Sequence, residues 1–281
     1  MPAPISNLPQ RLLRLRANLR RRFARAREPT RLRPRSPVPA PRVEVFVASL
    51  DTCDATALTI LSLRTHDDSG YEIVVGDGGS TDGSIEMLAQ LRGRGWLRLE
   101  ERSDRWRHHD WIEHRIARSE ADYVIFCDSD MEFRAPNVVR DLVDTAMRTG
   151  AALVAAELCR PGPGIEPISG DRIHMAARPS GWLFLVAPAV VRDLKTSFAF
   201  RFDPHGSSSG TGLAYDTGAA WFGELVERGM PWASMRGSFT RRYRHHGGMT
   251  WRPILGLEDD ERAAALREHI QQSLERLRAL D

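Results

Sequence analysis

The stretch YVIFCDSD, residues 123–130, decides the fold of this 281-residue chain. Its first five residues form an unbroken apolar run, and two aspartates one residue apart, Asp128 and Asp130, follow at once. A short continuous apolar run is typical of a strand buried on both faces, as in a parallel sheet. Ligands of such sheets bind at the carboxyl ends of the strands. We therefore expect the two carboxylates to stand at a ligand-binding edge.

Similar apolar runs alternate with helical patterns on both sides of this stretch. The first half predicts strands at 43–49, 71–77, 96–101 and 123–128, and helices at 55–66, 82–93, 109–119 and 138–150. The second half is less regular, with strands near 151–157 and 182–187, a Gly/Ser loop at 206–212, and helices near 217–229 and 260–279. This alternation predicts an α/β fold with a mostly parallel central sheet flanked by helices.

The charge of the chain is divided between two regions. Residues 1–42 carry twelve arginines and one acid, a net charge of +11, whereas the remainder carries −8. Leucines and Phe23 recur at helical spacing in this extension, and five prolines follow in 29–42, which predicts a basic amphipathic helix and a linker. Such a helix binds anionic membrane surfaces. A disordered basic tail, or a start site placed too far upstream, explains the composition as well.

Composition also limits the class of protein. The three cysteines form no CxxC pair, which argues against a disulfide framework or a zinc site and favours a reducing cytoplasm. No apolar run approaches the roughly 18 residues of a membrane span. Because the basic excess lies in the extension, no nucleic-acid-binding domain is expected. We expect a cytoplasmic protein, with the inner membrane face as a possible partner of the extension.

A glycine-rich segment, GDGGSTDGS at 76–84, follows the second predicted strand. Its glycines permit a tight turn, and Asp77 is placed to accept hydrogen bonds from a base or ribose. The spacing does not fit the G-x-G-x-x-G fingerprint, and a P-loop needs a lysine that this segment lacks. An ordinary strand-to-helix turn is the alternative interpretation.

The CDSD turn at 127–130 predicts a cation site. The chain turns at a strand end, so Asp128 and Asp130 can converge on one hard cation although they are two residues apart. Mg²⁺ and Mn²⁺ prefer oxygen ligands, and Mg²⁺ commonly binds one or two carboxylates together with substrate phosphates. An exposed acidic turn is the alternative, but it fits poorly after so apolar a strand.

Together the segments VEVFVASLD, YEIVVGDGGSTDGS and YVIFCDSD resemble family 2 glycosyltransferases of the GT-A fold, over about residues 43–160. The resemblance implies a single domain at 43–281, with a nucleotide-sugar-binding half at 43–150 and an acceptor half at 151–281. It implies that Asp77 contacts the nucleotide, that Asp128 contacts the sugar nucleotide and the cation, and that Asp130 is the main cation ligand. Ser49 and Asp51 would lie beside the nucleobase. The segment departs from the common pattern, because Gly78 follows Asp77 where many members have Asn or Asp.

The resemblance also suggests roles for residues outside these segments. Asp216, just before the helix near 217–229, is the preferred catalytic base, with a helix cap as its alternative role and Asp203 as a substitute. His245 or His246 would complete the cation site, and Glu113 would bond a ribose or sugar hydroxyl unless it is a solvated helix acid. Three arginines would meet the diphosphate, with a basic surface loop as the alternative, and two tryptophans would stack on a sugar, with core packing as the alternative. These residues, together with His109, which is expected to be a surface histidine, are Arg241, Arg242, Arg244, Trp182 and Trp251.

The predicted activity is metal-dependent, inverting transfer of a sugar from a nucleoside-diphosphate sugar to an acceptor hydroxyl, with Mn²⁺ or Mg²⁺ as cofactor. The acceptor, whether a glycan, a lipid-linked glycan or a small molecule, is not specified by any motif. A sugar nucleotidyltransferase is one alternative, but SLDTCDAT after the first strand has neither glycine nor arginine. A non-catalytic, membrane-associated binding module is the other, and the intact aspartate pair argues against it.

Overall fold

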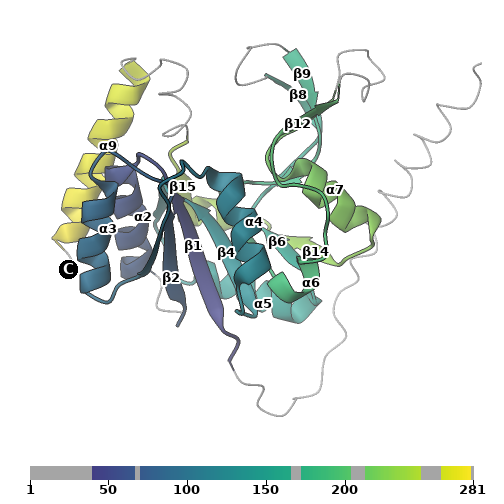
Figure 1. Ribbon diagram of the computed structural model, residues 1–281, viewed down its shortest axis with the longest axis horizontal. Coiled ribbons are helices and arrows are strands. Elements are labelled where there is room, and N and C mark those ends of the chain that lie inside the picture. The colour runs from purple at the N-terminus through teal and green to yellow at the C-terminus, as the bar shows by residue number, and fades with distance from the viewer. Residues whose placement is uncertain (1–39, 67–69, 166–171, 204–212, 248–260, 280–281) are drawn as a thin grey trace, which may run out of the picture. The chain divides into compact units, whose positions relative to one another are not determined.

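The computed structural model describes residues 40–66, 70–165, 172–203, 213–247 and 261–279 (Figure 1). All but Ala40 belong to one compact unit, Pro41–Asp281. The predicted amphipathic helix and linker of residues 1–42 lie almost wholly outside the described residues, as do the Gly/Ser loop and Trp251. Within the described ranges, no helix has the length and apolar content that crossing a bilayer requires.

A seven-stranded sheet forms the centre of the molecule, in the order β14-β6-β11-β4-β1-β2-β3. Its strands are β1 (Val43–Ser49), β2 (Glu72–Asp77), β3 (Arg98–Glu101), β4 (Tyr123–Asp128), β6 (Leu153–Ala155), β11 (Leu183–Val186) and β14 (Trp232–Ser234). Neighbouring strands pair in parallel except at β11, which is antiparallel to both β4 and β6. The predicted α/β class with a mostly parallel sheet is therefore confirmed.

Helices cover both faces of the sheet, as the continuous apolar runs predict. The helices are α2 (Cys53–His66), α3 (Ser84–Gly93), α4 (His108–Arg118), α5 (Val138–Thr149), α6 (Pro188–Val191), α7 (Ala219–Glu227) and α9 (Glu261–Arg278). Alternate residues of one strand enter different cores: Val45 and Val47 pack with α2, α3 and α5, whereas Phe46 packs with α4, α6 and α7. A third apolar cluster joins α9 to α2, at the left of Figure 1.

Short strands outside the central sheet were missed by the sequence patterns. One pair consists of β5 (Met131–Phe133) and β15 (Tyr243–His245), which follows the 3₁₀ helix η1 (Phe239–Arg242). The others are β7 (Leu158–Cys159), β8 (Gly162–Ile165), β9 (Arg172–Met175), β10 (Arg178–Pro179), β12 (Arg201–Asp203) and β13 (Leu213–Tyr215). Segments of two to four residues are too short to display a period of two.

Candidate active site

Three strands end side by side and form the edge on which the candidate site stands. Ser49 at the end of β1 is in register with Asp77 of β2, and Ala48 is in register with Asp128 of β4. The parallel arrangement therefore brings the predicted aspartates of distant segments to one edge, as the strand-end argument requires.

Buried hydroxyl groups of α2 and of Thr52, the residue before α2, hold the turn after β4. The single proton of the Thr59 hydroxyl faces the carbonyl oxygens of Ser129 and Met131, each 2.8 Å from Oγ1, and the hydroxyl oxygen accepts the Met131 amide at 2.9 Å. Thr52 donates to the Ser129 hydroxyl at 3.0 Å. These contacts hold the backbone on both sides of Asp130, whose side chain is only 7% exposed. Polar residues on the buried face of α2 thus shape the turn that carries the carboxylates.

A strand from late in the chain completes the group. The β5–β15 ladder places His245 opposite Met131, and the His246 amide donates to the Asp130 carbonyl at 3.0 Å. His245 Nε2 then lies 3.4 Å from Asp128 Oδ2 and 3.2 Å from Asp130 Oδ1. Of the two candidate histidines, the structure brings His245 to the aspartates and turns His246 away, toward Glu132.

The electrostatics of this cluster follow from its close charges. Burial alone lowers the pKa of His245, but the carboxylates of Asp128 and Asp130 outweigh it and raise the pKa of His245 to about 10. Burial raises the pKa of Asp128, and His108 and His245 together bring that pKa below its ordinary value. His108 Nε2 lies 3.1 Å from Asp128 Oδ1, so a second histidine, which sequence reasoning passed over for His109, also faces the pair.

The ligand atoms of Asp128, Asp130 and His245 suit a divalent cation. All three lie within 4.8 Å of one another. In octahedral coordination at 2.0–2.1 Å, adjacent ligand atoms stand about 3.0 Å apart, close to the separations from His245 Nε2. Two carboxylates and one imidazole match the preferences of Mn²⁺ and, less well, Mg²⁺. The residues present therefore fit the predicted cofactor.

The glycine-rich loop packs against the same edge. Gly78 leaves no room for a side chain, because a Cβ there would lie 2.1 Å from the Trp106 carbonyl oxygen. Asp51 joins this loop to the end of β1, since its Oδ1 accepts the Thr81 amide at 2.7 Å and its Oδ2 pairs with Arg105 at 2.7 Å. Burial raises the pKa of Asp51, but Thr81 and Arg105 outweigh burial and lower it.

The profile of glycosyl transferase family 2 matches residues 45–186, half of the chain and the whole of the edge just described. The chain belongs to glycosyl transferase family 2. Its central sheet, with the aspartate pair after β4, is that of a GT-A glycosyltransferase, as the sequence predicted.

Two solved structures are similar to this chain at low sequence identity, and the first shares its fold. The mannosyltransferase PcManGT from Pyrobaculum calidifontis, in complex with GDP-Man and Mn²⁺, is 15% identical with a TM-score of 0.53, covering 94% of this chain and 80% of that one. Glucosyl-3-phosphoglycerate synthase from Mycobacterium tuberculosis, with Mn²⁺, UDP and phosphoglyceric acid, is 15% identical with a TM-score of 0.47, covering 82% and 78%. At such identity the likeness concerns the fold alone. No curated protein matches the chain significantly.

Two predicted nucleotide contacts of the glycosyltransferase are turned inward. Asp77 is fully buried, and its carboxylate accepts the amides of Gly79 and Ser80 at 3.0 and 2.8 Å and the Ser80 hydroxyl at 2.6 Å. The Ser49 hydroxyl is buried against that of Thr56 at 3.2 Å. In this conformation both side chains shape the loop from within, so Asp51 is the predicted contact that is exposed at the edge.

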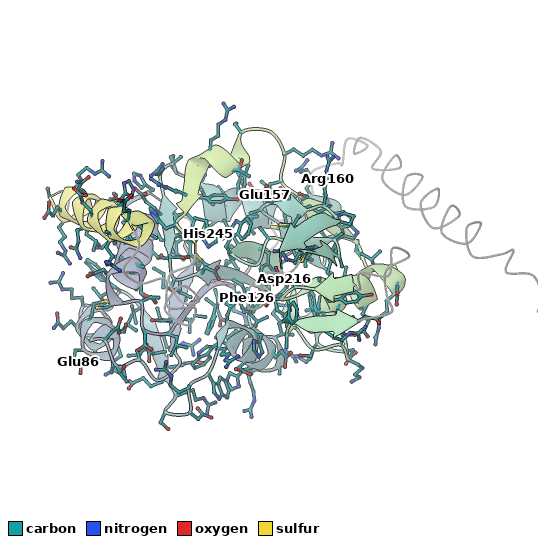
Figure 2. The ribbon with its side chains drawn as sticks, turned by 90° about the horizontal axis from the view of Figure 1, so that it is seen from above. Glu86, Phe126, Glu157, Arg160, Asp216 and His245 are labelled. Atoms are coloured by element: carbon teal, nitrogen blue, oxygen red, sulfur yellow. The ribbon has the colours of Figure 1, made fainter. Side chains whose placement is uncertain are left out.

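Asp216 of the glycosyltransferase makes an ion pair that the sequence did not suggest. Its Oδ2 accepts Arg178 Nε at 2.9 Å, and its Oδ1 accepts the Thr217 amide at 2.8 Å. The cap of α7 is Gly218 in the left-handed region, so the helix-cap role is wrong. Figure 2 labels Asp216 and His245, and both lie toward the middle of this view from above, whereas Glu86 lies at its margin. The role of Asp216 as base stays a prediction.

The other predicted site residues are engaged elsewhere. Glu113 is exposed on α4, as the alternative of a solvated helix acid expects, and its Oε1 accepts the Ser197 hydroxyl and the Phe198 amide, both at 2.6 Å. A bond from Glu113 to a ribose or sugar hydroxyl stays a prediction. Arg242 donates to Asp141 at 2.5 Å, and Arg244 lies 3.1 Å from His269 Nε2, so the diphosphate contacts of both stay predictions. His109 pairs with Asp110, its neighbour on α4, at 3.5 Å. Asp203 ends β12 opposite Leu213.

Sequence reasoning also missed Glu157, which follows β6 at the same edge of the sheet. Burial, and after it the nearby Glu157 carboxylate, together raise the pKa of the Tyr243 hydroxyl to about 12. Glu157 is exposed, so its carboxylate is free to meet a ligand at this edge. A signal was present, because Glu157 ends the predicted strand 151–157 just as Asp128 ends 123–128.

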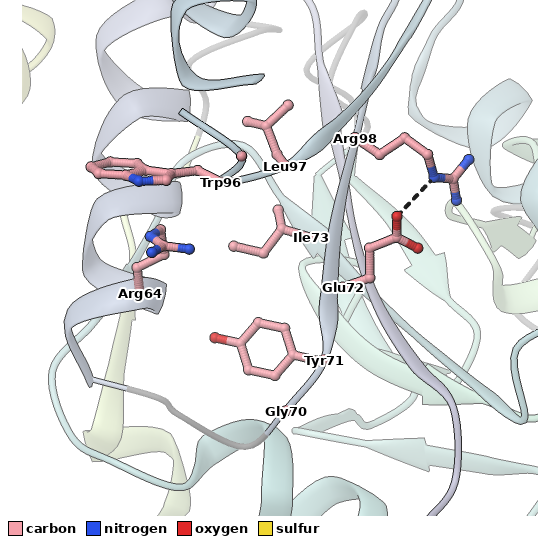
Figure 3. A pocket seen from close by; sticks show the side chains of 9 residues that line it. Arg64, Gly70, Tyr71, Glu72, Ile73, Trp96, Leu97 and Arg98 are labelled. Atoms are coloured by element: carbon pink, nitrogen blue, oxygen red, sulfur yellow. Dashed lines mark hydrogen bonds and ion pairs between the residues drawn. The ribbon is translucent and has the colours of Figure 1, made fainter. Parts of the chain in front are cut away.

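A hollow of about 600 Å³ lies at the opposite edge of the sheet (Figure 3). It is lined by Arg64, Gly70, Tyr71, Glu72, Ile73, Gly95, Trp96, Leu97 and Arg98. These residues stand at the end of α2 and at the amino ends of β2 and β3, and Arg98 Nε donates to Glu72 at 3.0 Å. The hollow is therefore separate from the aspartate edge and is not the donor site.

Proposed function

We propose that this family 2 glycosyltransferase transfers a sugar, with inversion, from a nucleoside-diphosphate sugar to an acceptor hydroxyl, and that it requires Mn²⁺ or Mg²⁺. The observation that carries the proposal is the convergence of Asp128, Asp130 and His245 at the carboxyl edge of a parallel sheet. The GDP-Man and Mn²⁺ bound to the Pyrobaculum calidifontis mannosyltransferase, which shares the fold, support this choice of ligands.

Five residues are assigned to the cation and the sugar-nucleotide donor. Asp128, Asp130 and His245 would hold the cation, which as a Lewis acid stabilises negative charge on a leaving diphosphate. Asp51 and Arg105 stand at the mouth of the glycine-rich loop, where Asp51 would accept a hydrogen bond from the nucleoside. The guanidinium of Arg105 would meet the phosphates, because its side chain is 57% exposed.

The acceptor hydroxyl needs a base, and Asp216 is the proposed one. Arg178 holds the Asp216 carboxylate in one orientation, and a positioned carboxylate can accept the proton of the acceptor hydroxyl. Attack of the activated oxygen on the anomeric carbon, from the side opposite the diphosphate, inverts that centre in one displacement. Arg178 thus positions the base, and it would not itself touch the reacting atoms.

A thermal-shift panel of UDP-, GDP- and dTDP-sugars, each with and without Mn²⁺, tests the donor site. A ligand that binds only the folded state raises the unfolding midpoint by mass action, so we expect one nucleotide to raise it and to require Mn²⁺. Asp130→Ala should abolish that shift, whereas Asp144→Asn, at an exposed position of α5, should keep it. A shift that survives Asp130→Ala would refute the assignment.

Turnover separates an enzyme from a binding module of the same fold. With the nucleotide found in the panel, the protein should release nucleoside diphosphate slowly to water and faster with an added acceptor. Asp130→Ala should remove both activities. Binding without any release of diphosphate, over a range of glycan and small-molecule acceptors, would favour the module instead.

A further inference from the structure

A second group of metal-ligating side chains lies beside the site just described. Glu132 of β5, His246, which follows β15, and His269 of α9 each contribute one atom to a cluster in which all three lie within 4.8 Å of one another. The cluster shares no residue with Asp128, Asp130 and His245. It joins three segments that are far apart in the sequence.

Two members of the cluster, Glu132 and His246, are buried. The His246 side chain has no exposed surface, and neither of its ring nitrogens makes a hydrogen bond within the described part of the chain. Nε2 nevertheless lies 3.3 Å from Glu132 Oε2, and the ring stands 5.1 Å from that of His269. Buried polar groups that lack a partner are rare and call for an explanation such as a missing ion. A cation between these atoms would supply the partner.

The distances match tetrahedral zinc. Ligands at Zn–N and Zn–O distances of 2.0–2.1 Å stand about 3.3 Å apart in a tetrahedron. Glu132 Oε2 lies 3.3 Å from Nε2 of both His246 and His269. Two imidazoles with one carboxylate form a known zinc set that leaves a fourth position for water, whereas Mg²⁺ prefers oxygen ligands.

Two guanidinium groups stand at the rim of the cluster and compete with a cation. Arg134 Nη2 lies 2.7 Å from Glu132 Oε2, and Arg244 Nη1 lies 3.1 Å from His269 Nε2. The Arg134 side chain is 41% exposed, so it can move away into the solvent when a cation binds Glu132 Oε2. The cation would therefore replace Arg134 at the carboxylate, and its affinity would be reduced by that competition.

We propose that Glu132, His246 and His269 form a second cation site, of the zinc type, that fastens α9 to the β5–β15 pair. Because His246 directly follows His245, the bound cation would also limit movement of the strand that brings His245 to the aspartates. The proposal does not depend on sugar transfer, since its three ligands lie outside the proposed donor site.

Equilibrium dialysis against Zn²⁺ alone tests the site. We expect two equivalents per chain in the unaltered protein, one in Asp130→Ala, one in His269→Ala, and none in the double variant. His269 is partly exposed and should tolerate substitution, and Gln272→Ala, at an exposed position of the same helix, serves as the control with two equivalents. Loss of all zinc in Asp130→Ala, or a second equivalent that persists in His269→Ala, would overturn the proposal.

Two further measurements report on the site without any activity assay. Arg134→Ala should bind the second equivalent more tightly, because it removes the competing guanidinium; weaker binding would contradict the competition and the site with it.

Zn²⁺ should slow amide hydrogen exchange in α9 of Asp130→Ala, and it should have no such effect in Asp130→Ala/His269→Ala. Equal exchange rates with and without Zn²⁺ in both variants would show that no cation fastens the helix.

Discussion

The indole of Trp182 stacks on the imidazole of His245, with ring centroids 4.8 Å apart and planes inclined by 16°. The carbonyl of Trp182 also accepts the Asp128 amide at 3.0 Å, so one residue supports two of the three proposed cation ligands. The sequence left two roles open for this tryptophan, stacking on a sugar and core packing. The indole face toward His245 is covered by the imidazole, and stacking on a sugar stays a prediction.

Trp182→Leu should weaken Mn²⁺ binding, because the His245 ring would lose the surface that fixes its orientation. Changes to groups that orient a metal ligand typically cost about 10–100-fold in affinity. Trp182→Phe keeps an aromatic face and should lose much less. Mn²⁺ titration in the presence of nucleoside diphosphate measures both. Equal affinities for the Leu and Phe variants would mean that the stacking does not matter.

Without cations, the stability of the protein should fall between pH 6.5 and 10. The pKa of His245 is raised from 6.5 to about 10 in the folded state, so its contribution is complete below 6.5 and is lost as the pH rises toward 10. Denaturant unfolding in EDTA at several pH values should show the loss in the unaltered protein and a flatter profile in His245→Gln. Mn²⁺ affinity should rise over the same range, because binding releases the His245 proton.

Asp216→Asn should reduce sugar transfer while donor binding stays unchanged. General base catalysis typically contributes about 10²–10⁴-fold to the rate. Arg178→Lys keeps a positive partner and should lower the rate less than Asp216→Asn, with a shifted pH profile as the sign of a positioning role. Transfer rates at saturating donor measure the effect. Full activity in Asp216→Asn would move the search for the base to Glu157 or Asp203.

Gly76→Ala should destabilise the fold by overpacking the core beside the glycine-rich segment. A Cβ at this position of β2 would lie 2.6 Å from Phe46 Cζ and 2.7 Å from the Trp111 ring, so the core must shift. Overpacking of this kind costs about 1–3 kcal/mol. Gly93→Ala is the matched control, because nothing lies within 4 Å of its Cβ position. Denaturant unfolding should separate the two variants clearly.

Glu224→Ala should lower the free energy of unfolding by about 1.5–3 kcal/mol, the usual value of hydrogen bonds to a charged group. Its carboxylate accepts the amides of Lys195 and Thr196 at 2.9 and 2.7 Å and pairs with Arg228. Burial raises the pKa of Glu224, but these partners lower it to about 2. The stabilisation is therefore present above pH 4.5 and is lost as the pH falls toward 2. Chemical unfolding at pH 7 and pH 3 should show a smaller difference between the variants at pH 3.

The sequence predicted the parts of the molecule that local patterns specify. Strands β1 and β4 have their predicted bounds, and α5 ends before Gly150, which is left-handed at φ 66°. A strand was predicted near 182–187, but its antiparallel direction could not be, because an apolar run of four residues does not indicate the direction of a strand. The strands β5 and β15 depend on pairing across more than one hundred residues, which no local pattern records.

The acidic residues of the candidate site could be predicted from the sequence, but most of the side chains that contact them could not. Asp128 and Asp130 were visible because they end an apolar run, and a C-terminal histidine was expected from the family resemblance. The choice of His245 over His246 depends on which face of β15 meets β5, a matter of register. His108, Glu132 and His269 become neighbours of these groups only through packing, so their own segments gave no indication of it.

The β5–β15 pair also has a consequence for how the protein is made on the ribosome. All strands of the central sheet except β14 have been synthesised once residue 186 is added, and so has the aspartate turn. His245 follows some sixty residues later, so a nascent chain holds only two of the three proposed cation ligands. The proposed cation site therefore gains its third ligand only when the last segment of the chain is synthesised, after most of the sheet that carries the two aspartates.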